Sequence, residues 1–154
     1  NDNVTRFHPN LYRNGKVCLS LLNTWRGEQW TSCQTIRTIL LNLVTLFHNK
    51  PLLNEPGITE KYKFFNQYND IIKYSNYNTA IISFLKKKIK PDIACYFNKY
   101  IKSRYLKNKE EILKQLTELK KLYGKKLLQI TLYSNMNCLI NYFELYDKFL
   151  EIKL

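Results

Sequence analysis

The chain has 154 residues, a length that suits one domain, and a formal charge of +13 from 25 Lys and Arg against 12 Asp and Glu. A net charge this basic fits either an anionic partner or a solvated basic surface. The charge alone therefore does not indicate nucleic-acid binding. No apolar run reaches the ~18 residues of a membrane span, and the first residues lack the basic and apolar regions of a signal peptide. We therefore expect no membrane partner and no signal peptide.

The first two predicted segments precede the clearest helix. Asn1–Arg6 is polar, and we expect it to be frayed. The segment 7–22 is predicted to be turns and extended structure, because Pro9 forbids a helix there and Asn14-Gly15 favours a turn. A polar loop follows with Trp25, and Trp30 comes shortly after it; both tryptophans suit packing or partner contact, and core packing is the preferred role of Trp30.

Residues 32–47 form the clearest predicted helix, with Thr31 or Ser32 as its N-cap. Its apolar side chains recur at helical spacing and make a single stripe, formed by Ile36, Ile39, Leu40, Leu43 and Phe47. Residues 58–90 are predicted to form one or two helices that end in the lysine run Lys86, Lys87, Lys88 and Lys90.

The last third of the chain is predicted to be mostly helical. The pattern indicates a short aromatic helix over 93–106 and a second helix over 108–123, opened by a capping box of Asn108 and Glu111 and stopped by Gly124. The segment 125–137 is ambiguous, and a strand over 129–133 is one interpretation of it. A final helix is predicted from the face formed by Leu139, Phe143, Tyr146 and Leu150.

The four cysteines form no CxxC pair and no metal-ligand cluster with the two histidines. Unpaired cysteines are typical of reducing compartments. We therefore predict free thiols, no metal, and a cytoplasmic location, with the nucleus as an additional location. The four are Cys18, Cys33, Cys95 and Cys138.

The string FHPNLYRNGKVCLS, from Phe7 to Ser20, carries the chemistry. It places Asn10 eight residues before Cys18, with a turn between them. A thiolate is a nucleophile for acyl transfer, and a side-chain amide can donate a hydrogen bond to the oxyanion that forms when an acyl carbon becomes tetrahedral. On the residues alone, a buried structural Cys18 and a turn-forming Asn10 remain the alternative.

The whole string resembles the active-site segment of the ubiquitin-conjugating enzymes. In that family an HPN triplet precedes the thioester-forming cysteine by this spacing. Trp30-Thr31-Ser32 stands where the family has Trp-Ser-Pro before its central helix, and Asn54-Glu55-Pro56-Gly57 follows that helix. CLSLLNTW and NEPG are most similar to the large Z-type group, and the resemblance weakens through Leu85 and then stops.

The resemblance implies an α+β class, with a catalytic part over residues 1–85 and a basic helical extension over 86–154. In the Z-type group such an extension helps to select the activating enzyme; here, a set of helices that only covers apolar surface is the alternative. In the family a four-stranded antiparallel sheet comes before the triplet. Only six residues precede Phe7, so we expect this sheet to lie largely outside the chain and the apolar stripe of the central helix to be exposed.

The resemblance also implies roles for individual residues. Cys18 would carry the thioester, Asn10 would stabilise the oxyanion, and Glu55 would serve the incoming lysine amine. His8 and Pro9 would set the backbone shape. Ser20 stands where many members have Asp, and because a hydroxyl cannot act as a carboxylate, acid–base help from that side is not expected.

The implied function is that of a ubiquitin-conjugating enzyme. It would take ubiquitin or a ubiquitin-like protein from an activating enzyme and pass it to a substrate lysine or a ubiquitin ligase. No bound cofactor is expected, since the activating enzyme uses the ATP. The alternatives are a catalytically inert scaffold or fragment that binds ubiquitin or a ligase, and a nucleic-acid binder that uses the interleaved Lys and Tyr of residues 96–105, which no recognised motif supports.

Overall fold

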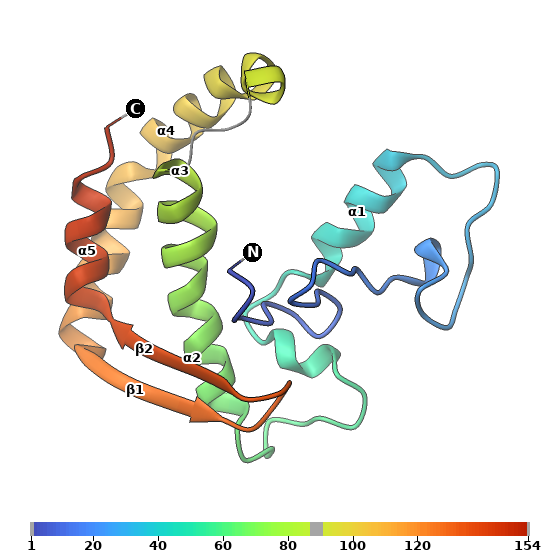
Figure 1. Ribbon diagram of the computed structural model, residues 1–154, viewed down its shortest axis with the longest axis horizontal. Helices are drawn as coiled ribbons and strands as arrows, with labels where there is room; N and C mark the ends of the chain where they lie inside the picture. The colour runs from blue at the N-terminus through green and yellow to red at the C-terminus, as the bar shows by residue number, and fades with distance from the viewer. Residues whose placement is uncertain (1, 87–90, 154) are drawn as a thin grey trace. The chain divides into compact units, whose positions relative to one another are not determined.

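The computed structural model describes residues 2–86 and 91–153, with side chains described except over 91–94 (Figure 1). Over these residues helices predominate and a two-stranded sheet is present, so the predicted α+β class is confirmed. The chain forms two compact units, Asn1–Ser75 with Gln129–Asn137 and Asn76–Leu128 with Cys138–Leu154. The domain division after Leu85, which the resemblance implied, stays a prediction.

Helix α2 (Phe65–Ser75) supplies the core of the first unit. Phe65, Tyr68, Ile71 and Ile72 recur on one face, and all four are buried because that face packs within the unit. The 3₁₀ helix Pro51–Asn54 packs on α2 and contributes the fully buried Leu52. This packing fixes the loop after Leu52 relative to the N-terminal segment.

The predicted fraying of Asn1–Arg6 is wrong for the described residues 2–6. The Asp2 carboxylate accepts hydrogen bonds from the backbone N–H groups of Val4 and Thr5, at 3.0 and 2.7 Å. Thr5 is buried against Ser75, with 3.3 Å between the two hydroxyl oxygens. A polar segment is ordered here because its side chains cap its own backbone, a possibility that composition does not reveal.

Helix α1 (Ile36–Leu46) begins later than predicted. Thr35, not Thr31 or Ser32, is the N-cap residue, and its N–H donates to the Thr38 hydroxyl at 3.2 Å. The helix buries none of its residues. The apolar stripe is accordingly accessible, as expected, and its most exposed members are Ile36, Leu40 and Phe47. Two apolar side chains outside the stripe, Leu41 and Val44, are exposed as well.

The region predicted as one or two helices over 58–90 is helical from Phe65 onward. The π-helix Asn76–Ser83 and the short α3 (Phe84–Lys86) continue α2. The segment 58–64 consists of turns. The end of the predicted helix, in the lysine run, lies outside the described residues.

Helix α4 (Pro91–Tyr123) is a single helix, so the two-helix prediction and the capping box are wrong. The Asn108 side-chain amide donates to the Arg104 carbonyl at 2.6 Å, a bond made inside a continuous helix. Gly124, with φ +54°, ends the helix as predicted. Leu116 and Leu119 are buried against α5, which runs alongside α4 (Figure 1).

The ambiguous segment forms a hairpin of β1 (Lys125–Ile130) and β2 (Met136–Asn141). Tyr133, Ser134 and Asn135 in its turn all have positive φ. Helix α5 (Tyr142–Leu150) therefore begins three residues after the predicted Leu139. The buried face of α5 is formed by Tyr142, Leu145 and Phe149, and it differs from the predicted face.

Candidate active site

The loop between Asn10 and Cys18 folds back on itself. Leu11 forms antiparallel bridges with His8 and with Val17. The predicted turn is present at Gly15, whose φ of +88° is strained for a residue with a Cβ, and the Gly15 N–H donates to the Tyr12 carbonyl at 3.0 Å. This fold brings the two ends of the motif together.

Two hydrogen bonds join Asn10 to Cys18. The Cys18 N–H donates to the Asn10 carbonyl at 2.8 Å, and the Asn10 side-chain Nδ2 donates to the Cys18 carbonyl at 2.8 Å. Cys18 is a free cysteine and only 3% exposed. The Asn10 amide thus holds the cysteine backbone, and since an amide nitrogen has two hydrogens, a second donor remains on it.

Cys18, Asn10 and Glu55 line one pocket of about 100 Å³. The sequence separates Glu55 from Cys18 by a loop and a helix, and the structure brings the three side chains to the same cavity. Its remaining walls come from the N-terminal segment, the motif and the two following loops, and consist of Arg6, Pro9, Tyr12, Trp25, Asn54 and Pro56.

Glu55 is held by a residue that sequence reasoning missed. The Tyr133 hydroxyl, from the hairpin turn, donates a short hydrogen bond to Glu55 Oε2. Burial, followed by this hydrogen bond and the carboxylate charge, raises the pKa of Tyr133, so the phenol remains a donor. No signal short of the tertiary fold links the two residues, because they are 78 positions apart.

Arg6 is a second pocket residue that the sequence did not single out. Its guanidinium carbon lies 3.6 Å from the Tyr12 ring centroid and 4.2 Å from that of Tyr133, so the cation is stacked between two aromatic faces. One guanidinium nitrogen, Nη2, also donates to the Pro9 carbonyl. A fixed positive charge therefore stands in the wall of the pocket that contains the thiol.

His8 and Pro9 are both buried, and their shape-setting role stays a prediction. The Asn10 N–H donates to His8 Nδ1 at 3.0 Å, and the Lys50 N–H donates to His48 Nδ1 at 3.2 Å. Both neutral rings therefore carry their proton on Nε2. The Asn54 side-chain amide lies 3.0 Å from His8 Nε2 and 2.7 Å from His48 Nε2, with one terminal atom facing both rings.

The Asn54 amide orientation follows from these tautomers. If the Asn54 Nδ2 faced the two rings, its N–H groups would meet the Nε2–H groups of His8 and His48. If Oδ1 faces them instead, it can accept a hydrogen bond from each ring. That orientation gives up only a 3.4 Å contact with a backbone carbonyl. A His8–Asn54–His48 chain thus connects the HPN triplet to the loop that carries Glu55.

The burial of His8 within this hydrogen-bonded chain predicts that the stability of the protein depends on pH. Burial, and then the neighbouring His48, lower the pKa of His8 from 6.5 to about 4. Between these values the unfolded chain binds more protons than the folded one, so stability is complete above pH 6.5 and is lost as the pH falls towards 4. The full loss is at most about 3 kcal/mol.

Urea unfolding between pH 4 and pH 7.5 measures this effect. His8→Asn keeps an acceptor for the Asn10 N–H but cannot titrate, so the slope should nearly vanish. His48→Asn, at an exposed position, is the control and should retain most of it. An unchanged slope in His8→Asn would assign the pH dependence to other groups.

The remaining motif residues lie outside this pocket or at its rim. Ser20 begins the 3₁₀ helix Ser20–Leu22 and is half-buried; it is not part of the pocket wall described above. Trp25 is 52% exposed at the rim, and Trp30 is 43% exposed. Core packing of Trp30 is therefore wrong for the described chain, because the loop places its ring towards solvent.

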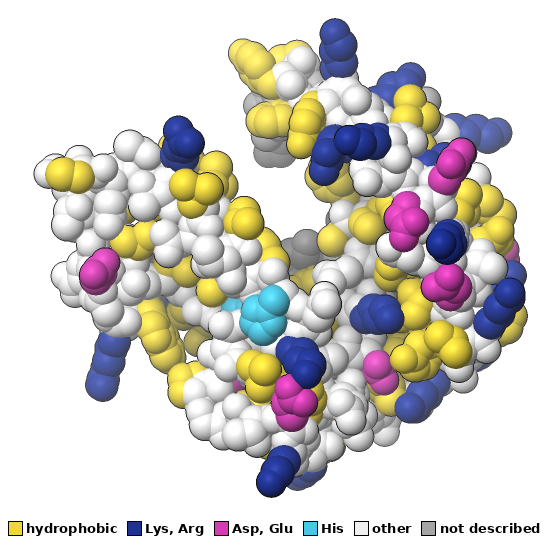
Figure 2. Space-filling model, turned by 180° about the vertical axis from the view of Figure 1, so that it is seen from behind, with side chains coloured by type: hydrophobic (Ala, Val, Ile, Leu, Met, Phe, Trp, Pro, Cys, Tyr) yellow, Lys and Arg dark blue, Asp and Glu magenta, His cyan; other side chains and the backbone are white. Residues whose placement is uncertain are grey.

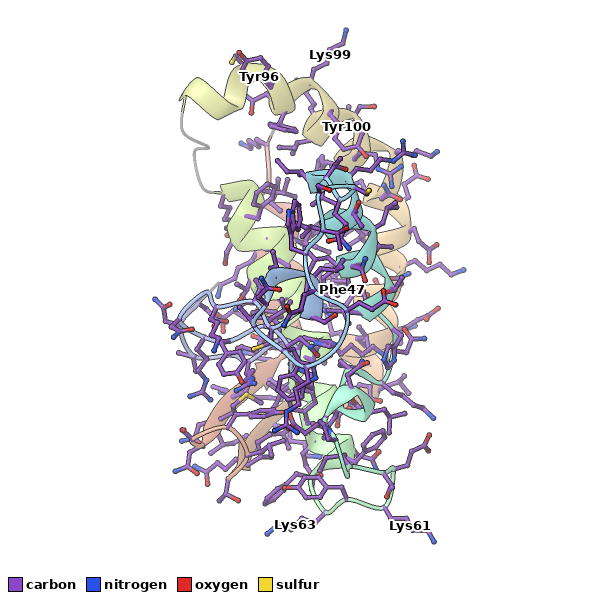
Figure 3. The ribbon with its side chains drawn as sticks, turned by 90° about the vertical axis from the view of Figure 1, so that its right-hand side faces the viewer. Phe47, Lys61, Lys63, Tyr96, Lys99 and Tyr100 are labelled. Atoms are coloured by element: carbon purple, nitrogen blue, oxygen red, sulfur yellow. The ribbon has the colours of Figure 1, made fainter. Side chains whose placement is uncertain are left out.

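Lysines and aromatic residues lie exposed on the first half of α4. Figure 3 shows Tyr96, Lys99 and Tyr100 extending from this helix into solvent. In Figure 2 basic side chains are interspersed with apolar ones over the visible face. This arrangement is that of a solvated basic surface and gives no specific support to nucleic-acid binding.

Two features of the described residues bear on other functions. Within 2–86 and 91–153, no helix is long and apolar enough to cross a membrane. Over the same residues, no group of three or more His, Cys, Asp or Glu side chains is placed to hold a metal ion.

Comparison with known proteins defines the class. Residues 3–81, about half of the chain, match the family model described as Ubiquitin-conjugating enzyme. The pocket described above is built mainly from this matched segment. The chain therefore belongs to the ubiquitin-conjugating enzyme family.

The chain is also similar in sequence to individual proteins that are named as members of this family. Ubiquitin-conjugating enzyme E2 Z of Danio rerio is 38% identical over 89 residues, covering 56% of this chain and 27% of that protein. Human ubiquitin-conjugating enzyme E2 Z is 37% identical over 89 residues, 56% of this chain and 25% of that protein. The probable ubiquitin-conjugating enzyme protein 17 of Caenorhabditis elegans is 36% identical over 121 residues, 71% of this chain and 16% of that protein. The chain spans about a quarter or less of the length of these curated relatives.

Proposed function

We propose that this chain forms the catalytic part of a ubiquitin-conjugating enzyme that carries ubiquitin, or a ubiquitin-like protein, as a thioester on Cys18. The observation that carries the proposal is that Cys18, Asn10 and Glu55 line one pocket. Membership of the family and similarity to proteins named ubiquitin-conjugating enzymes support it.

The proposed reaction has two acyl transfers. In the first, the Cys18 thiolate attacks the thioester carbonyl of ubiquitin on the activating enzyme; a new C–S bond forms and the activating enzyme's thiolate leaves. In the second, a lysine amine attacks the Cys18 thioester, a C–N bond forms, the amine loses a proton, and the Cys18 thiolate leaves. A ligase cysteine can take the place of the amine.

Asn10 and Glu55 have different proposed roles. Each transfer passes through a tetrahedral oxyanion, which the second N–H of the Asn10 amide can stabilise. Only transfer to lysine requires the loss of an amine proton, which Glu55 is proposed to accept or orient. The Arg6 cation lines the same pocket and can stabilise the negative charge of the oxyanion that forms there.

The proposed partners are ubiquitin or a ubiquitin-like protein, an activating enzyme, a ligase and substrate lysines. No cofactor bound to this chain is required, since ATP is consumed by the activating enzyme. Residues 86–154 are proposed to be an extension that helps to select the activating enzyme.

Glu55→Ala separates the two acyl acceptors. Charging should be unaffected, because no lysine takes part in it. Discharge of the pre-formed thioester to lysine should slow by about 10²-fold near neutral pH, and the deficit should shrink at high pH, where more amine is already neutral.

Single-turnover discharge to lysine and to a small thiol across pH measures this effect. The thiol is the internal control, because its attack needs no neutral amine. Equal losses with both acceptors at every pH would mean that Glu55 supports the loop and takes no part in proton transfer.

A second candidate is an inert scaffold that binds ubiquitin or a ligase, and the burial of Cys18 is the observation that favours it. Incubation of the complete protein with activating enzyme, ATP and ubiquitin distinguishes the two. A DTT-sensitive adduct supports the enzyme. Binding of ubiquitin without an adduct, across several ubiquitin-like proteins and their activating enzymes, supports the scaffold.

A further inference from the structure

The residue that holds Glu55 comes from outside the segment that matches the family. The family match ends at residue 81, and Tyr133 lies in the turn of the β1–β2 hairpin. Both residues belong to the first compact unit. A part of the chain beyond the family domain therefore reaches the candidate active site.

The hairpin turn is anchored independently of Glu55. Arg13 donates to the carbonyls of Ser134 and Asn135, at 3.4 and 3.2 Å. The Arg6 N–H lies 3.3 Å from the sulfur of Met136, which is 1% exposed. The turn is thus tied to the N-terminal segment and the motif through the three residues that follow the tyrosine.

The Tyr133 ring is fixed as well as the backbone. One face is covered by the Arg6 guanidinium, and its centroid lies 6.0 Å from that of the buried Tyr68 in an edge-on arrangement. Tyr68 is itself held by a 2.8 Å hydrogen bond from its hydroxyl to the Arg6 carbonyl. Because these contacts prevent the ring from rotating, its hydroxyl is held in a fixed position beside Glu55.

We infer that Tyr133 is a positioning residue for Glu55. Its hydroxyl holds the Oε2 atom of Glu55, so that the Oε1 atom of the same carboxylate is presented to the lysine amine. The inference rests on the proposed function, because it deepens the role of Glu55 in lysine transfer. In the step concerned, the amine nitrogen bonds to the thioester carbon, the C–S bond breaks with its electron pair going to Cys18, and one amine proton passes to Oε1. Tyr133 keeps its own proton throughout and contacts neither reacting atom.

A single substitution isolates the contribution of this hydrogen bond. The charged and titratable groups around Glu55 include Arg6, Tyr68 and Tyr133. Only the Tyr133 hydroxyl is removed by Tyr133→Phe, while the ring contacts with Arg6 and Tyr68 remain.

Tyr133→Phe in the complete protein tests the inference. Charging and discharge to a small thiol should match the wild type within about twofold, which also shows that the variant is folded. Discharge to lysine should slow about tenfold near neutral pH, and the deficit should shrink at high pH, as it does in Glu55→Ala. Tyr62→Phe, a half-buried tyrosine whose ring packs against Phe64, is the matched control and should behave like the wild type.

A double-mutant cycle separates the two ideas. In a Glu55→Ala background, Tyr133→Phe should have no further effect on lysine discharge. If Glu55→Ala alone leaves lysine discharge unchanged, the proposed role of Glu55 fails. If Glu55→Ala slows lysine discharge but Tyr133→Phe does not, or if Tyr133→Phe slows lysine and thiol discharge equally at every pH, the inference about Tyr133 is overturned while the role of Glu55 stands.

Discussion

Cys18→Ala should abolish formation of the DTT-sensitive adduct with ubiquitin or a ubiquitin-like protein in the presence of activating enzyme and ATP. The thioester needs the sulfur, and alanine has no nucleophile to replace it. Cys18→Ser should give a DTT-resistant ester or no adduct, because an oxygen ester is not cleaved by thiol exchange and serine is far less nucleophilic. Non-reducing and reducing gels of the same reaction measure the difference.

Cys33 provides the matched control for this experiment. It is a free cysteine like Cys18, but it is exposed and stands before α1. Cys33→Ala should charge like the wild type. A Cys18→Ala protein that still forms the labile adduct, or a Cys33→Ala protein that loses it, would refute the assignment of Cys18.

Asn10→Ala should slow both charging and discharge, by about 10²–10³-fold each, since each passes through an oxyanion and one donor is worth that much. Unlike the effect of Glu55→Ala, this loss should be the same for lysine and thiol acceptors. The structure adds a competing cause, because the Asn10 amide also donates to the Cys18 carbonyl. The loss of that hydrogen bond alone costs about 1 kcal/mol of stability.

A second variant in the same loop separates the two causes. Asn14 accepts a hydrogen bond from the Lys16 N–H at 3.1 Å, so Asn14→Ala removes one loop hydrogen bond without touching Cys18. Thermal melting and single-turnover rates are measured for both variants. Equal rate losses at equal losses of stability would mean that Asn10 acts by holding the loop, whereas a loss confined to Asn10→Ala supports the oxyanion role.

Much of the candidate site was predictable because it is local in sequence. The spacing of Asn10 and Cys18, with the Asn14-Gly15 turn between them, was enough to expect two side chains in one place, and short-range hydrogen bonds achieve it. Glu55 could be proposed only through the resemblance of the NEPG segment to the family. Its position beside Cys18 depends on the packing of the 3₁₀ helix Pro51–Asn54 against α2.

Element boundaries were less predictable where local signals compete. Asn108 suggested a capping box, but a side chain that can cap a helix can also bond the carbonyl four residues earlier, and within α4 it does so. Leu139 and Phe143 fit a helical face, yet the chain pairs Leu139 into β2 and α5 buries Tyr142 and Leu145. Periodicity identifies an apolar face but not which of two neighbouring faces will find a partner.

The sequence by itself determined the helical character of most of the chain, the free cysteines, and the proximity of Asn10 and Cys18, because these depend on residue types and on spacings of a few positions. Only the tertiary structure decided that Arg6 is stacked between Tyr12 and Tyr133 and that Tyr133 holds Glu55. Such contacts join segments up to 127 positions apart in the chain (Arg6 to Tyr133). They arise when separate segments are packed into one core, and no local pattern of residues encodes which side chains will then meet.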